Sequence, residues 1–74
     1  MLRQWKQTTR GGYWVRGIEP INGDGYDYEL RGEVGNHSNE PPSEDPADWH
    51  WETWRSDGRY SANESVFDLM EVQA

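Results

Sequence analysis

The chain has no cysteine among its 74 residues, so no disulfide can hold its fold together. This absence indicates a reducing compartment, or a fold that does not depend on oxidation. No apolar run is long enough to span a bilayer, and the first six residues lack the apolar segment of a secretory signal. The sequence therefore predicts a protein that stays in the cytoplasm where it is made, with no membrane partner.

Apolar residues are scarce, at 32% of the chain, which is below the usual share for a globular domain. A chain of this length forms at most one domain, residues 1–74, and buries only about 60% of its unfolded surface. The aromatic share is high, at 14% with five Trp and four Tyr, and aromatic side chains bury a large area each. Because small scaffolds without disulfides or metals commonly associate, we expect a homo-oligomer.

Basic residues are confined mainly to the start of the chain. Four cations and no acid precede Glu19, whereas three cations and fourteen acids make up the charges from Glu19 onward. The net charge of −7 disfavours long DNA or RNA as a partner, because a polyanion is repelled. The asymmetry leaves two interpretations open: one face binds a small anionic partner, or the arginines simply pair with the excess carboxylates.

The residues that catalysis and metal binding require are also few. There is no cysteine nucleophile, no serine in a nucleophile-elbow pattern, and no glycine-rich turn followed by Gly-Lys-Ser/Thr. The two histidines, His37 and His50, lie near Asp45 and Asp48, but zinc normally takes three or four ligands of the His or Cys type. We expect no enzyme, no cofactor and no metal site.

Residues 26–34 carry the clearest periodicity, because apolar and charged side chains alternate along them as in a half-buried strand. On the preceding strand, Tyr13 and Val15 should share one face, with Trp14, Arg16 and Ile18 on the other; Pro20 should end it. Strands are predicted at residues 6–10, 13–18, 26–34, 49–55 and 59–62, with a closing strand at 69–72.

Residues 35–48 form an acidic, proline-rich loop in this interpretation. The loop contains three prolines and has nothing apolar to bury. A loop of this length in a small domain is either functional or a tolerated surface insertion. Its four acids are Glu40, Glu44, Asp45 and Asp48.

Tryptophans on a two-residue period follow the loop, and an Asp57-Gly58 turn comes next, which together predict a hairpin of residues 49–55 and 59–62. Ser65 and Asp68 have the spacing of a capping box around a single turn. We therefore expect a mainly β fold with no long helix: a small, strongly bent antiparallel sheet or an SH3-like barrel of about five strands.

Binding chemistry is better represented than catalysis. Exposed indole and phenol rings stack on nucleobases, and guanidinium groups donate to phosphates. For Tyr28, Trp51 and Tyr60 a place in the core is the stronger expectation. The candidate ligand-binding residues are Arg10, Trp14, Arg16, Trp54, Arg55, Arg59 and Tyr60.

Both ends of the chain resemble a widespread group of small proteins from tailed phages and prophages. The motifs are Thr9-Arg10-Gly11-Gly12 at the start, then Trp54-Arg55-Ser56-Asp57-Gly58-Arg59-Tyr60, Glu64-Ser65 and Asp68-Leu69 near the end. The middle of the chain carries no such motif, and its acidic loop departs from the short connection usual in the group.

The resemblance implies a β protein in the cytoplasm of a bacterial host. By analogy with small phage proteins, we expect a non-catalytic anti-defence factor that sequesters a cyclic nucleotide immune signal or a similar small anionic ligand. One alternative is an acidic nucleic-acid mimic that inhibits a host defence protein, such as a nuclease or CRISPR effector. A second alternative is a phage structural or assembly factor.

Overall fold

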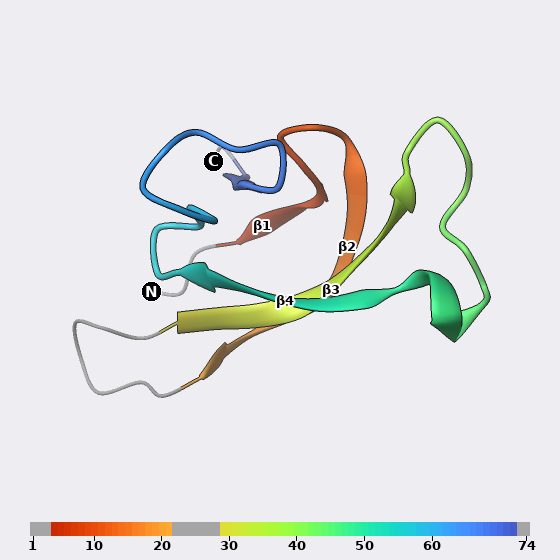
Figure 1. Ribbon diagram of the computed structural model, residues 1–74, viewed down its shortest axis with the longest axis horizontal. Coiled ribbons are helices and arrows are strands. Elements are labelled where there is room, and N and C mark those ends of the chain that lie inside the picture. The colour runs from red at the N-terminus through yellow and green to blue at the C-terminus, as the bar shows by residue number, and fades with distance from the viewer. Residues whose placement is uncertain (1–3, 22–28, 73–74) are drawn as a thin grey trace.

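A computed structural model describes residues 4–21 and 29–72 of the chain. Five antiparallel strands form one sheet in the order β4-β3-β2-β1-β5, curled into a half-barrel (Figure 1). This confirms the expected mainly β fold. The strands are β1 (Trp5–Thr9), β2 (Tyr13–Ile21), β3 (Glu29–His37), β4 (His50–Arg55) and β5 (Leu69–Glu71).

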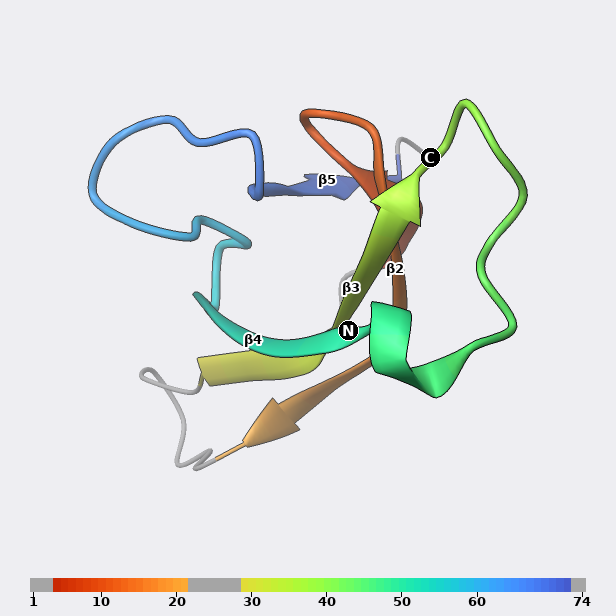
Figure 2. The same ribbon diagram turned by 45° about the vertical axis from the view of Figure 1, so that its right-hand side comes forward.

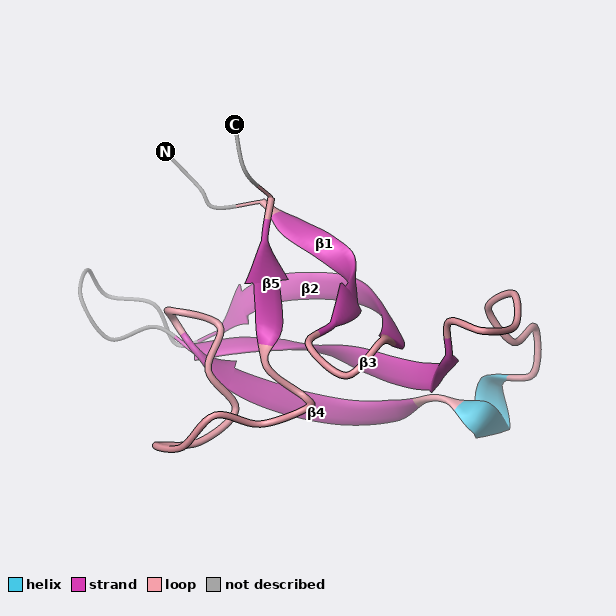
Figure 3. Ribbon diagram, turned by 90° about the horizontal axis from the view of Figure 1, so that it is seen from above, coloured by secondary structure: helices cyan, strands magenta, loops and turns pink. Residues whose placement is uncertain are grey.

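The core lies on the concave side of the curled sheet. Figure 3 shows β1 and β5 passing across the layer of β2, β3 and β4. Apolar side chains from both parts pack together to form the core. Trp54 is the most deeply buried of these, with 2% of its surface exposed. The buried cluster is Val15, Leu30, Val34, Trp54 and Leu69, with Trp5, Tyr13, Ile18 and Phe67 packed against it.

The alternation predicted for residues 26–34 is confirmed over its described part. Leu30 and Val34 are buried, whereas Glu29 and Arg31 are exposed. The predicted turn at 22–25 and the start of that predicted strand at 26–28, with Tyr28, lie outside the described residues. β3 also continues to His37, so the loop after it is shorter than the predicted range 35–48.

β2 departs from the prediction in length and in the direction of one side chain. The strand runs through Pro20 to Ile21, where Pro20 faces Leu30. A bulge at Gly17, which has a φ of 64°, adds one residue to β2 between its pairs with β3. The extra residue turns Ile18 toward the core, so Ile18 does not share the face of Arg16 as predicted.

The predicted second hairpin strand at residues 59–62 is wrong. β4 pairs with β3 over its whole length, and no strand forms at 59–62. The Asp-Gly turn is present, because the N–H of Gly58 donates to the carbonyl of Arg55 at 2.8 Å. Beyond it, the Tyr60 N–H donates to the Asp68 carboxylate at 2.9 Å, which draws the chain away from β4 and toward β5.

The capped turn predicted at residues 65–68 is present. The Phe67 N–H donates to the Ser65 hydroxyl at 3.1 Å, and the Ser65 N–H donates to the Asp68 carboxylate at 3.0 Å, as in a capping box. The connection from β4 to β5 contains no strand, and these hydrogen bonds fix its backbone. No helix in the described segments has the length and apolar character needed to cross a membrane.

Candidate ligand-binding groove

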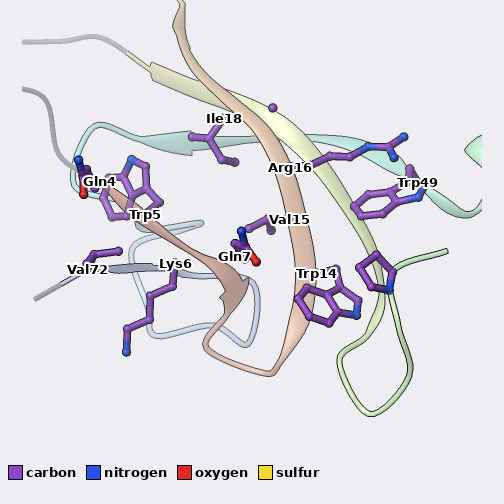
Figure 4. A pocket seen from close by; sticks show the side chains of 12 residues that line it. Gln4, Trp5, Lys6, Gln7, Trp14, Val15, Arg16, Ile18, Trp49 and Val72 are labelled. Atoms are coloured by element: carbon purple, nitrogen blue, oxygen red, sulfur yellow. The ribbon is translucent and has the colours of Figure 1, made fainter. Parts of the chain in front are cut away.

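A groove opens where β1 separates from β2. The two strands form a hairpin around Gly11-Gly12 but pair in register only at Thr8 and Trp14. Beyond this pair, β1 follows β5 while β2 follows β3, so the sheet divides. The space between has a volume of about 730 Å³ and is bordered by both strands, by Pro42 and Trp49, and by Val72 (Figure 4).

The described lining of this groove combines indoles and cations without a carboxylate. Trp5 and Lys6 come from β1, Trp14 and Arg16 come from β2, and Trp49 comes from the approach to β4. The chain has twice as many acids as bases, so a groove lined by cations and no carboxylate has the opposite charge to the protein as a whole. It provides an attractive site for an anion carrying an apolar or aromatic group.

Arg16 is held in place but remains accessible. Its guanidinium carbon lies 3.9 Å from the centre of a Trp49 ring, which is a cation–π contact. Its Nε donates to Glu33 at 3.1 Å, while 46% of the side chain is exposed. Because a guanidinium has five N–H donors, one carboxylate contact through Nε does not exhaust its capacity to bind an anion.

Two indoles of the groove fasten the acidic loop to the sheet. The Nε1–H of Trp14 donates to the carbonyl of Glu40 at 2.8 Å, and that of Trp49 donates to the carbonyl of Ser43 at 3.0 Å. The Asn36 side chain donates to the Pro41 carbonyl and accepts from the Ser43 N–H, both at 2.9 Å. The loop is thus fixed beside the groove by these hydrogen bonds, which also orient the indole rings of Trp14 and Trp49.

The loop returns to β4 through a short 3-10 turn, Pro46–Asp48, which Figure 2 shows beside the start of that strand. Asp45 caps the turn, because its carboxylate accepts from the Ala47 N–H at 2.9 Å. The Asp48 carboxylate accepts a hydrogen bond from the Ser43 hydroxyl. Two of the four loop acids therefore hold the loop in shape.

The structure brings two of the seven predicted site residues, Trp14 and Arg16, into the groove. Arg10 lies elsewhere, with its guanidinium 3.3 Å from the Asp68 carboxylate and 3.1 Å from that of Glu64. Trp54 cannot stack on a ligand, because it is buried in the core and its Nε1–H donates to the Phe67 carbonyl at 2.8 Å.

The other three predicted residues also lie outside the groove. Arg55 ends β4 and Arg59 follows the turn, both exposed. Tyr60 is 39% exposed, against the expectation of a core position, and its hydroxyl donates to the Glu52 carboxylate at 3.3 Å. The negative charge of Glu52 raises the pKa of this phenol. Trp51 was also expected in the core and is 62% exposed.

Sequence reasoning missed Trp5, Lys6 and Trp49 as groove residues. Lys6 belongs to the basic start of the chain, which is the one sequence signal that pointed to it. Nothing in the sequence showed that β1 separates from β2 after one pair, because that depends on β5 competing for β1. Within the described segments, no three His, Asp or Glu side chains gather in a way that could hold a metal ion.

Comparisons of the chain with protein-family models, curated proteins and solved structures find no match. The resemblance to small phage proteins therefore stays a prediction from the motifs. Function has to be inferred from the groove.

Proposed function

We propose that this protein is a non-catalytic binding protein whose groove between β1 and β2 takes a small anionic ligand with an aromatic ring, best matched by a nucleotide. The observation that carries the proposal is the lining: three indoles and two cations, with no carboxylate among the described lining residues. Indoles stack on bases and cations bind phosphates, so the two halves of a nucleotide each find a partner there.

The size of the groove supports the same ligand class. Its volume of about 730 Å³ falls within the range of roughly 300–1,000 Å³ typical of small-molecule sites. The net charge of −7 opposes a long nucleic acid, because a polyanion is repelled. A cyclic nucleotide signal of host immunity is the specific ligand that the resemblance to phage proteins suggests, with sequestration as its purpose.

Ligand binding should raise the melting temperature, because a ligand that binds only the folded state stabilises it. At a ligand concentration of 100 times Kd the gain is about 2.7 kcal/mol, which for a domain of this size shifts Tm by roughly ten degrees or more. Differential scanning fluorimetry against cyclic di- and trinucleotides and mononucleotides measures this shift. A flat response to all of them contradicts the proposal.

Lys6→Glu should weaken nucleotide binding at least about tenfold, because it replaces a groove cation with an anion. Arg59→Glu makes the same change in net charge at an exposed position outside the groove, so it should leave Kd within about twofold. Isothermal titration calorimetry of both variants distinguishes a local site from a general charge effect. Equal losses in the two variants place the ligand elsewhere.

The acidic loop supports a second candidate function, mimicry of nucleic-acid phosphates toward a basic host protein. Its backbone is fixed by Trp14, Trp49 and Asn36, so its exposed acids have defined positions. Replacing Glu40, Glu44, Asp45 and Asp48 by their amides should abolish a salt-sensitive complex of this kind. An inhibitory activity that survives the four changes would show that the loop is not the mimic of nucleic-acid phosphates.

A further inference from the structure

The convex side of β2, β3 and β4 carries a regular array of charged and aromatic residues, which we name the outer face. Register places its members opposite one another in three rows across the strands. The rows are Arg16, Glu33 and Trp51; then Glu19, Arg31 and Thr53; then Ile21, Glu29 and Arg55.

The outer face is electrically neutral in a strongly acidic protein. It holds three arginines and three glutamates, whereas the whole chain has a net charge of −7. The signs alternate between neighbouring positions, as the Arg16–Glu33 and Arg31–Glu19 ion pairs at 3.1 Å show. The net charge of −7 makes two copies of this chain repel each other, and a neutral outer face adds nothing to this repulsion where two such faces meet.

Trp51 is a large apolar residue whose side chain is exposed to solvent on this face. It is 62% exposed, and the guanidinium carbon of Arg31 lies 5.1 Å from its ring centre. A flat indole beside a guanidinium is the composition typical of interface hot spots, where both groups gain when water is excluded. The core cluster has five buried apolar residues, none of them in the outer-face rows, so burial of Trp51 would add to a small total.

We propose that the outer face is the contact surface of a homodimer, with a second copy of this chain as its occupant. In a twofold dimer the same patch meets itself, so it must be complementary to itself. Alternating charges of zero sum meet that requirement when the twofold axis lies between the first two rows, because Arg16 of one copy then faces Glu19 of the other, and Glu33 faces Arg31. The contact also gives a scaffold of 74 residues the additional burial that a chain without disulfides commonly obtains by association.

Analytical ultracentrifugation of the full chain over a concentration series tests the proposal. The wild type should be a dimer that dissociates on dilution. Arg31→Glu gives each outer face a net negative charge and should raise the dimer Kd at least about tenfold, and Trp51→Ala should do the same by removing the large exposed apolar group of the face. The double variant Glu19→Arg, Arg31→Glu restores neutrality but sets like charges beside Arg16 and Glu33, so its dimer should stay about as weak as that of Arg31→Glu. Recovery of the wild-type affinity would show that net charge, and not the alternating pattern, holds the dimer.

Arg59→Glu is the matched control, because it changes the net charge equally at a site off the outer face and should leave the dimer Kd within about twofold. Circular dichroism establishes that each variant keeps its fold. A wild type that is monomeric at the highest concentration overturns the proposal. So does a dimer that both Trp51→Ala and Arg31→Glu leave intact, since it then forms through another surface. Arg16 belongs to both the groove and the outer face and is therefore left unchanged in both tests, whereas Lys6→Glu lies off the outer face and should not alter the dimer Kd.

Discussion

Replacing Trp54 with alanine should cost about 3–5 kcal/mol of folding free energy, the largest effect expected of any single change. The indole is 2% exposed at the centre of the core. Its removal leaves a cavity between β3 and β5. The Phe67 carbonyl, which accepts a hydrogen bond from the indole Nε1–H at 2.8 Å, also loses this donor. Because a domain of this size has a total stability of roughly 4–11 kcal/mol, the variant should be close to unfolding at room temperature.

Trp51→Ala provides the control, since it makes the same chemical change three positions earlier in β4, at an exposed site. At submicromolar concentration, where mass action favours monomers, it should cost less than about 0.5 kcal/mol. Urea unfolding followed by circular dichroism gives both values. Similar losses for the two variants would mean that the core is not centred on Trp54.

Asp68→Asn should destabilise the protein by about 2–3 kcal/mol, although it removes almost no volume. The residue is 1% exposed, and its carboxylate accepts from the Tyr60 N–H at 2.9 Å, the Ser65 N–H at 3.0 Å and the Arg10 Nε at 3.3 Å. An amide offers one acceptor oxygen and turns an NH₂ group toward donors, so buried N–H groups lose their partners. The bonds join Tyr60 and Ser65 of the β4–β5 connection to each other and to Arg10 in the turn between β1 and β2.

Glu64→Gln is the matched control for this change, because Glu64 is the other carboxylate that Arg10 contacts. Its side chain is 67% exposed, so the loss should be below about 0.5 kcal/mol. Thermal and urea unfolding of both variants measure the difference. If Glu64→Gln costs as much as Asp68→Asn, the charge of Arg10 rather than the buried hydrogen bonds holds the connection.

The stabilisation by Asp68 should also depend on pH. Burial alone raises the pKa of this carboxyl, but the hydrogen bonds from Tyr60, Ser65 and Arg10, with the charge of Arg10, outweigh burial and hold the pKa below its ordinary value of 3.8. The contribution is therefore present above pH 3.8 and is lost as the pH falls through the lower folded-state pKa.

Consequently the difference in free energy of unfolding between wild type and Asp68→Asn should have its largest value near pH 7 and should shrink below about pH 4. Urea titrations at a series of pH values give this difference directly. A gap that stays constant into the acid range would show that ionisation of Asp68 does not contribute to stability.

The sequence by itself determined the fold class and much of the strand pattern. The alternation of residues 29–34 placed Leu30 and Val34 in the core, because side chains of a strand point to opposite faces and only one face is covered. The capped turn at residues 65–68 was also predictable, since the hydroxyl and the carboxylate that close it lie three positions apart. Both features depend on neighbours along the chain.

Tertiary structure alone decided which strands pair, which indoles are buried and where a ligand can enter. Trp49, Trp51 and Trp54 look alike in the sequence, yet the first lines the groove, the second is exposed and the third fills the core. Pairing of β4 with β3 sets the faces of Trp51 and Trp54, and a hydrogen bond to the Ser43 carbonyl of the loop orients Trp49. The groove exists because β5 pairs with β1 and leaves most of β2 to β3. That competition joins residues more than fifty positions apart, a distance over which local propensity carries no information.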